Sequence, residues 1–312
     1  MVTQNTDYRP RFEWRFLGPR FWPIWLTVAL LGLMLYLPAG VRNRLARLVG
    51  RHLLARHQKR RRIVTTNLEW CFPNKTAAER AKMLDRYYFY AARAILDYAL
   101  FWFATRRHVA RKVRLVNEDY LLQYAEAQRV IILTCHTLGL EYGALAITQR
   151  LATVGLIKPA RNPLFEWLVS RGRTRFHGRL FDRNTGLRPI VHAIRTGQRF
   201  YYLPDEDLGG SQQTTFASFF GVPTATLTSL GRLARMCEAV VVPCITYLDE
   251  ASDQYVVHFF PPETDFSSGD EQGDSEHMNR LLEVMIGQAP EQYMWSLRLF
   301  QTRPKGEASP YN

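Results

Sequence analysis

His136 and Glu141 form the His-x4-Glu pair that most directly suggests chemistry in this chain of 312 residues. Inside one regular helix, five positions would turn the two side chains away from each other. A bonded pair therefore requires His136 to stand in extended chain just before a helix that carries Glu141. Glu141 would then hold one ring nitrogen and fix the tautomer, which leaves the other nitrogen as a general base. A strand-end histidine bonded only to backbone is the alternative, and the spacing alone leaves both interpretations open.

Polar residues follow three of the strands that the sequence predicts, at the point where each strand ends. His136 follows the first strand, a basic stretch from Lys158 to Asn162 follows the second, and Asp205, Glu206 and Asp207 follow the third. In open sheets of this kind, ligands bind beyond the carboxyl ends of the strands. The fold would therefore bring a histidine, a basic group and a carboxylate cluster to one edge of the sheet.

The elements that position these residues alternate between apolar strands and helices. Continuous apolar strands separated by helices predict an α/β fold with a mostly parallel central sheet covered by helices on both faces. Thr76 and Glu79 form a capping box that opens a long, aromatic-rich helix ending near residue 104. We expect strands at residues 129–135, 154–157, 199–203 and 239–242, an edge strand at 255–260, and helices at 138–149, after 162–163, at 228–236 and at 276–286.

The N-terminal region has the pattern of a membrane anchor. Lys and Arg number 41 against 28 Asp and Glu, a net charge of +13 (41 − 28). Residues 21–41 are uncharged and contain Trp22 and Trp25. Nine basic residues and no acid follow directly: Arg42, Arg44, Arg47, Arg51, Arg56, Lys59, Arg60, Arg61 and Arg62. This order is typical of a membrane helix whose following domain faces the cytoplasm and anionic lipid.

Other interpretations of this region are a secretory signal, which lacks a good cleavage site, and a buried helix of a soluble domain. A helix bounded by Pro23 and Pro38 offers only about 15 residues, or roughly 22 Å, against an apolar bilayer core of about 30 Å. We expect it to span at a thin place or to lie in one leaflet. The chain then divides into a tail and membrane anchor (residues 1–41), a basic juxtamembrane segment (42–62) and one α/β domain (63–312).

Two further classes of function are weighed against this pattern. Cys135 beside His136 suggests a thiol nucleophile, but neighbouring strand residues point to opposite faces, which favours packing for Cys135. A nucleic-acid binder would explain the charge, yet the sequence has no helix-turn-helix, zinc-finger or RNP signature. The four cysteines have no metal-ligand spacing, so we expect reduced thiols and no metal.

Several stretches, taken in order, resemble one enzyme family. His136 to Glu141 matches the H-x4-(D/E) motif of glycerolipid-type acyltransferases. The chain as a whole more closely resembles the late acyltransferases of bacterial lipid A biosynthesis, the lauroyl/myristoyl class. The further stretches that carry this resemblance are residues 67–73 (NLEWCFP), 161–168 (RNPLFEWL), 171–173 (RGR), 202–207 (YLPDED), 293–295 (YMW) and 305–307 (KGE).

The resemblance implies transfer of a fatty acyl group from acyl carrier protein to a hydroxyl on an acyl chain of a lipid A precursor. It implies work at the cytoplasmic face of the bacterial inner membrane, in lipopolysaccharide biosynthesis, with the acyl carrier protein as co-substrate and no other cofactor. His136 would be the base and Glu141 its stabilising partner, without an acyl-enzyme. A lysophosphatidate or glycerol-phosphate acyltransferase with the same dyad is the alternative enzyme.

Candidate substrate-binding residues follow from the same resemblance. Arg161 and Asn162 precede the helix that begins at Pro163, where the helix dipole would help Arg161 to hold an anion such as a lipid phosphate. A solvated loop arginine is the alternative for Arg161. Four further candidates have a functional and a structural interpretation that the sequence leaves open: Arg171 and Arg173 contact phosphates or face water, and Asp205 and Asp207 orient the site or form a turn.

Overall fold

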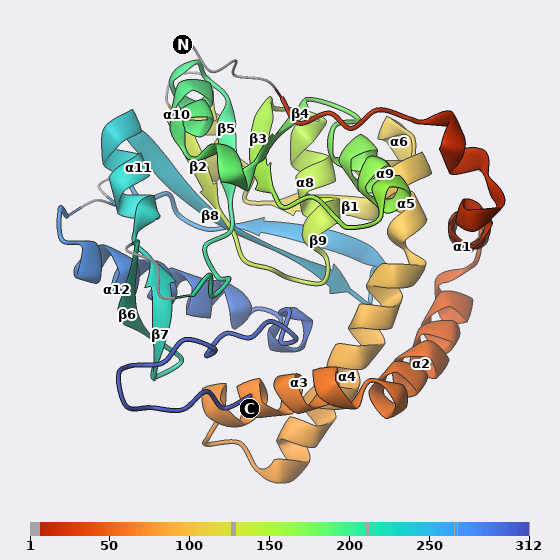
Figure 1. The fold of residues 1–312 in the computed structure, drawn as a ribbon, viewed down its shortest axis with the longest axis horizontal. Helices are drawn as coiled ribbons and strands as arrows, with labels where there is room; N and C mark the ends of the chain where they lie inside the picture. The colour runs from red at the N-terminus through yellow and green to blue at the C-terminus, as the bar shows by residue number, and fades with distance from the viewer. Residues whose placement is uncertain (1–6, 126–128, 210–212, 265, 267, 312) are drawn as a thin grey trace.

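A seven-stranded sheet forms the centre of the computed structural model, which describes residues 7–125, 129–209, 213–264, 266 and 268–311 (Figure 1). The strand order is β1-β9-β8-β2-β5-β3-β4. The strands are β1 (Val113–Val116), β2 (Arg129–Leu133), β3 (Thr153–Ile157), β4 (Gly178–Asp182), β5 (Arg199–Tyr202), β8 (Ala239–Asp249) and β9 (Gln254–Phe259). A separate antiparallel pair consists of β6 (Thr214–Phe219) and β7 (Val222–Leu227).

The predicted mostly parallel sheet is confirmed. Five strands, from β8 to β4 in the sheet order, run parallel to their neighbours, whereas β9 is antiparallel to β8 and parallel to β1. The prediction that residues 255–260 form an edge strand is wrong, because β1 pairs with the outer side of β9 from Val113↔Tyr255 to Val116↔His258. β1 has only four residues, and a strand this short does not produce a periodic pattern that can be recognised in the sequence.

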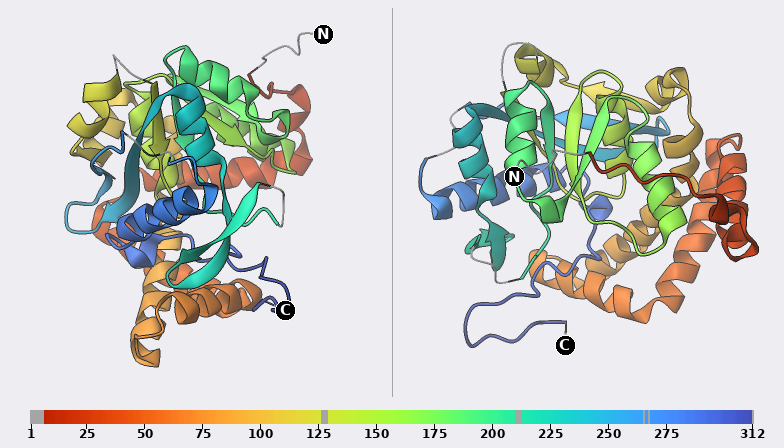
Figure 2. Two further views of the ribbon diagram at one scale, coloured as in Figure 1. Left: turned by 90° about the vertical axis from the view of Figure 1, so that its left-hand side faces the viewer. Right: turned by 45° about the horizontal axis from the view of Figure 1, so that its top comes forward.

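Helices cover both faces of the sheet, as Figures 1 and 2 show. Alternate residues of β2 point into different cores: Ile131 and Leu133 into one, Val130 and Ile132 into the other. The first core contains buried residues of α3 (Gln58–Cys71), α10 (Arg188–Arg195), α11 (Ser229–Cys237) and α12 (Glu271–Ile286). The second contains residues of α2 (Ala39–Arg56), α5 (Tyr98–Phe103), α6 (Arg106–Lys112), α7 (Asp119–Ala125), α8 (Leu140–Thr148) and α9 (Pro163–Arg173).

The predicted capping box opens α4 (Ala77–Leu96): the Thr76 side chain accepts from the backbone of Glu79, whose carboxylate accepts from the backbone of Thr76. The predicted helix to residue 104 is interrupted, because α4 ends at Leu96 and α5 begins at Tyr98. Asp97 stands between the two helices and is buried among cationic and phenolic groups. This interruption turns the aromatic residues of α5 toward α8 and α9.

Buried ion pairs hold the N-terminal helices to the sheet. Arg42 Nη1 lies 2.5 Å from Asp97 Oδ1, and the second amino group of Arg42 contacts Asp253, in the turn between β8 and β9. Arg93 contacts the same two carboxylates, and Lys112 Nζ lies 2.6 Å from Asp253 Oδ2. Buried charges are costly unless they are paired, so this network joins α2, α4 and α6 to one turn of the sheet. Arg42 therefore does not join the exposed basic residues of segment 42–62, whereas the other eight are exposed.

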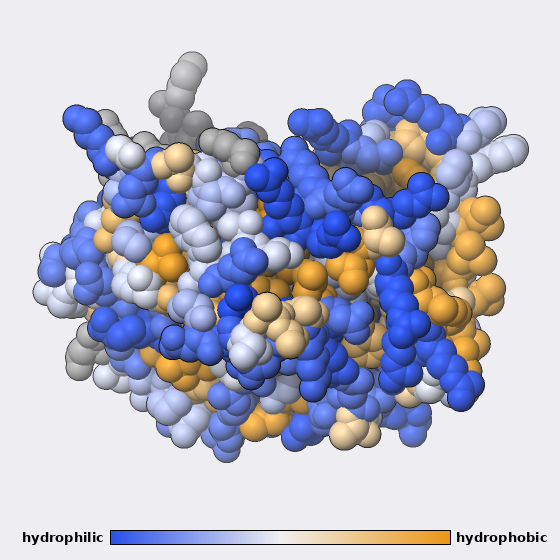
Figure 3. Space-filling view, turned by 90° about the horizontal axis from the view of Figure 1, so that it is seen from below, coloured by the Kyte–Doolittle hydropathy of each residue, from blue (hydrophilic) through white to orange (hydrophobic). Residues whose placement is uncertain are grey.

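The predicted membrane helix corresponds to α1 (Trp22–Met34), which has 13 residues. No helix in the described part of the chain is both long enough and apolar enough to cross a bilayer. α1 ends at Met34, four residues before Pro38, the N-cap residue of α2. Val28 packs with residues of α9 in a third, small core, whereas much of the apolar surface of α1 stays exposed (Figure 3).

Candidate active site

His136 and Asp205 meet because their strands are neighbours in the sheet. β2 and β5 are parallel, and Leu133 is paired with Tyr202. Each functional residue lies three positions beyond that pair, so both arrive at the same place on the carboxyl edge. Asp205 Oδ1 lies 2.7 Å from His136 Nδ1, and the backbone N–H of His136 donates to Asp205 Oδ2 at 2.7 Å.

The predicted bond between His136 and Glu141 is wrong. The described hydrogen bonds of the Glu141 carboxylate come from Arg173: Nε donates at 3.1 and 3.2 Å, and an amino group donates at 2.5 Å. Glu141 lies in the first turn of α8, after a turn in which Thr137 bridges to Tyr293. Since β5 already delivers a carboxylate to Nδ1, Asp205 has the orienting position that the sequence gives to Glu141.

The C-terminal segment supports the base from the other side. Met294 N–H donates to the His136 carbonyl at 2.8 Å, and Leu138 N–H donates to the Gln292 carbonyl at 2.9 Å. Asn67 on α3 holds this segment in turn, because its amide donates to the Trp295 carbonyl at 2.7 Å. The sequence motifs around residues 67 and 293 mark these positions, but their spacing gives no sign that they support His136.

Electrostatics favour a histidine that is poised as a base. Burial alone would lower the pKa of His136, but the charge and hydrogen bond of Asp205 outweigh it, and the pKa is raised above 6.5. Burial would raise the pKa of Asp205, yet the bonds from His136 lower it below 3.8, so this carboxyl stays ionised. Burial raises the pKa of the Cys135 thiol well above 9.0, which makes its thiolate inaccessible at neutral pH.

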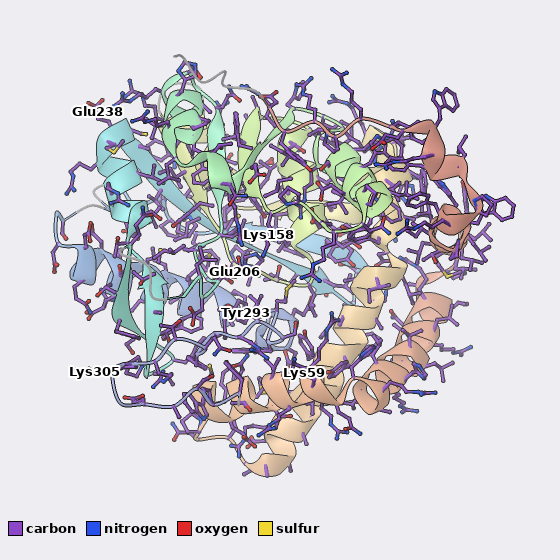
Figure 4. All side chains as sticks on the ribbon, viewed as in Figure 1. Lys59, Lys158, Glu206, Glu238, Tyr293 and Lys305 are labelled. Atoms are coloured by element: carbon purple, nitrogen blue, oxygen red, sulfur yellow. The ribbon has the colours of Figure 1, made fainter. Side chains whose placement is uncertain are left out.

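A cavity of about 1160 Å³ lies against the site, and His136 and Arg173 are among its lining residues. The His136 side chain is 24% exposed, whereas that of Asp205 is 2% exposed. Because Nδ1 is bonded to Asp205, Nε2 is the ring nitrogen that remains for a substrate in the cavity. Figure 4 labels Lys158 and Glu206, which line the same cavity, near the centre of the view.

The predicted substrate-binding residues separate into two groups. Asp205 and Arg173 lie at the site, but Arg161 and Asn162 are exposed and do not line the cavity. Asn162 instead caps α9, since its side chain accepts from Phe165 N–H at 3.0 Å.

Arg171 and Asp207 have other surroundings. Arg171 lines a separate cavity of about 680 Å³ and lies over the ring of Trp167. Asp207 accepts from Thr302 N–H at 2.6 Å and from the Thr302 hydroxyl at 2.9 Å, which ties the C-terminal segment to the strand end. Asp207 also accepts from Gly209 N–H at 2.9 Å, the contact expected of a residue that forms a turn.

An ionised carboxylate, an oriented imidazole and a large cavity lie together at the carboxyl edge of a parallel sheet, an arrangement that is chemically able to take a proton from a bound ligand. Comparison with known proteins identifies the class of enzyme more closely. The model of the bacterial lipid A biosynthesis acyltransferase family matches residues 9–302.

Individual relatives agree with this match over nearly their whole length. A lipid A biosynthesis lauroyltransferase of Escherichia coli K12 is 33% identical over 304 residues, which cover 97% of this chain and 99% of that protein. A lipid A biosynthesis acyltransferase of Haemophilus influenzae is 30% identical over 308 residues, 98% of this chain and 96% of that protein. The chain belongs to the bacterial lipid A biosynthesis acyltransferase family and is an O-acyltransferase.

Proposed function

We propose that this enzyme transfers a fatty acyl group from acyl carrier protein to a hydroxyl on an acyl chain of a lipid A precursor, by direct attack. The hydroxyl oxygen bonds to the thioester carbonyl carbon while His136 Nε2 takes its proton. The C–S bond then breaks, and the carrier thiolate leaves and recovers the proton from the imidazolium. Atoms and charge balance without an acyl-enzyme.

The observation that carries this proposal is the bond between Asp205 and His136 Nδ1, at 2.7 Å. It keeps the proton on Nδ1 and stabilises the imidazolium, as an orienting acid does for other histidine bases. Glu141 acts one step further away, because it fixes Arg173, which brings a positive charge to the cavity. A fixed cation there favours the negative charge that develops on the carbonyl oxygen during attack.

The proposed place of action is the cytoplasmic face of the bacterial inner membrane. Helix α1 is apolar on all sides, and it exposes Trp22, Leu26, Leu30 and Leu33. Exposed apolar surface of this kind, close to exposed basic residues of α2 such as Arg44, supports binding to the surface of an anionic bilayer. A helix lying in the interface needs no spanning length.

The catalytic proposal is tested with the purified full chain, acyl carrier protein charged with a fatty acid, and a lipid A precursor with free hydroxyacyl chains. We expect a product heavier by one acyl group in mass spectrometry. His136→Ala should lose about 10²- to 10⁴-fold in kcat. His57→Ala, at an exposed position between α2 and α3, is the control that should keep wild-type activity. Faster turnover of a lysophosphatidate than of the lipid A precursor would replace this proposal by the glycerolipid alternative.

The membrane proposal is tested by sedimentation with vesicles that contain phosphatidylglycerol. Replacing Leu26, Leu30 and Leu33 together by Ser should weaken binding, and salt should remove most of what remains because the residual attraction is electrostatic. Val284→Ser, at an exposed apolar position of α12, is the matched control. Unchanged, salt-resistant binding of the triple variant would show that α1 is not the contact.

A further inference from the structure

The cavity beside His136 contains more positive charge than its own acids can neutralise. Glu206 is the one acidic residue among its described lining residues, and Arg183 pairs with it at 3.3 Å. Arg173 is paired with Glu141. Four other lining cations have no acidic partner within the described residues: Lys158, Arg188, Arg195 and Arg232. Arg195 donates to the Met236 carbonyl at 2.8 Å, which leaves three without a hydrogen-bond partner among the described residues.

These three cations come from three different elements that converge on one space. Lys158 directly follows β3, and Arg188 is the first residue of α10. Arg232 lies in the middle of α11, on the same face as Ser229 and Met236, which also line the cavity at helical spacing. The fold therefore gathers these charges at the edge of the sheet that also carries the base.

Arg232 is the most enclosed of the three. Its side chain is half-buried, whereas Lys158 and Arg188 are exposed. Burial raises the pKa of Tyr202, and the positive charge of Arg232 offsets part of that rise. The Tyr202 hydroxyl bonds to the Ser229 hydroxyl at 2.6 Å on the cavity wall. A half-buried guanidinium without a carboxylate keeps its bidentate donors available to a ligand.

The shape of the lining indicates what kind of anion fits. Val191 and Leu233 line the same cavity from the two helices that carry Arg188 and Arg232, and Leu187, directly before α10, joins them. A ligand that contacts both the cations and these apolar side chains has an anionic group attached to an apolar or extended chain. Both substrates of the proposed reaction have that chemistry: the lipid A precursor has sugar phosphates beside acyl chains, and the carrier's arm joins a phosphodiester to the acyl thioester.

We propose that Lys158, Arg188 and Arg232 form a phosphate-binding subsite that orients a substrate toward His136. This proposal rests on the proposed function and extends it to residues that the sequence motifs do not mark. Like charges in one cavity repel each other, and a bound phosphate dianion or phosphodiester relieves that repulsion. The subsite replaces the anion site expected at Arg161, which lies outside the cavity.

Arg232→Gln and Arg188→Gln are the test variants, since each removes one positive charge and leaves a shorter, neutral amide. Arg280→Gln, at an exposed position of α12 away from the cavity, makes the same change of net charge and is the control. With both natural substrates, Arg232→Gln should lose about 10- to 100-fold in kcat/KM, the effect of one charge-assisted bond. Arg188→Gln should lose less because its side chain is exposed, and Arg280→Gln should match the wild type.

Substrates without phosphate identify the source of the anion. If the acceptor's phosphate is bound, the loss in Arg232→Gln should shrink to within about twofold on a dephosphorylated lipid A precursor. If the donor's phosphodiester is bound, the loss should instead shrink with acyl-pantetheine. A loss that persists undiminished with both phosphate-free substrates would overturn the subsite.

A binding measurement separates this proposal from the proposed function. A titration with inorganic phosphate, monitored by phosphorus NMR, should show that phosphate binds more weakly to Arg232→Gln than to the wild type and to Arg280→Gln. Equal binding by all three proteins would overturn the subsite even in an active enzyme. If the wild type fails to acylate a lipid A precursor but shows this pattern of phosphate binding, the substrate assignment fails and the subsite stands.

Discussion

Asp205→Asn is the substitution that most directly tests the role of the histidine. The two oxygens of Asp205 accept from the backbone N–H and from Nδ1 of His136, each at 2.7 Å. An Asn side chain of the same shape has one accepting oxygen and one donating amide. The backbone N–H cannot move its hydrogen, whereas the imidazole can. We therefore expect the oxygen of Asn to face the backbone and the ring to move its proton to Nε2, where it blocks the base.

The size of the effect follows from the loss of the base. A general base contributes about 10²- to 10⁴-fold to the rate, so kcat should fall by about that factor when Nε2 carries the proton. The Asp205 side chain is 2% exposed, so solvent does not screen this loss.

The pH dependence supplies a second measurement with a definite sign. In the wild type the pKa of His136 is raised above 6.5, and only the neutral ring acts as a base. When the pH is lowered from about 8, kcat/KM should therefore begin to fall before pH 6.5 is reached. Asp205→Asn removes the charge that raises this pKa and leaves the burial that lowers it. The acidic limb should therefore move to lower pH.

The assay is initial-rate acyl transfer across the pH range, combined with nitrogen NMR of the labelled ring to identify the protonated nitrogen. Glu206→Gln is the control, because the Glu206 charge also raises the pKa of His136 but contributes less than Asp205. It should move the acidic limb in the same direction by a smaller amount and leave the tautomer unchanged. Wild-type kcat in Asp205→Asn, or an acidic limb that stays in place, would refute this role for Asp205.

Three further substitutions test other parts of the structure. Cys135→Ala should keep kcat within about twofold and lose about 1 kcal/mol of unfolding free energy in urea, since the thiol packs in the core; a trapped thioester-linked acyl-enzyme would contradict this. Glu141→Gln should lower kcat by about tenfold through the released Arg173 but leave the acidic limb in place, and a limb displaced as far as in the Asn variant would contradict this. Arg93→Met leaves Asp253 short of one cation and should cost about 3–5 kcal/mol in urea unfolding; a loss below about 1 kcal/mol would show that the network adapts.

The position of His136 and Asp205 at the carboxyl edge of the sheet was predictable from the sequence, whereas the bond between them was not. Apolar runs identify β2 and β5, and the polar residues after them follow directly. However, β5 lies next to β2 because the chain first forms β3 and β4 farther out in the sheet and then returns to the position between β2 and β3, and local sequence patterns do not specify that order. This return of the chain separates Asp205 from His136 by 69 residues in the sequence and places the two side chains together at the sheet edge.

The N-terminal region shows the converse case, in which a correct local pattern leads to an incorrect environment. The run of basic residues after an apolar stretch is real, and eight of its members are exposed. Arg42 differs only because Asp97 and Asp253 are placed opposite it by α4 and by the turn after β8. A run of basic residues predicts a solvated face unless carboxylates that are distant in the sequence form ion pairs with it. The local sequence pattern does not show which residues form such pairs.

Long-range contacts of this kind also explain how the enzyme can hold His136 in place at the end of a strand, where little secondary structure supports it. The His136 backbone is fixed on one side by Asp205 and on the other by Met294. Met294 lies in a segment that is held by Asn67 from α3 and by Asp207 through Thr302. Each of these bonds joins parts of the chain that lie 69 or more residues apart. The base therefore acquires its orientation only when the whole domain has closed around it, and a loss of packing far from the cavity should appear first as a misplaced His136.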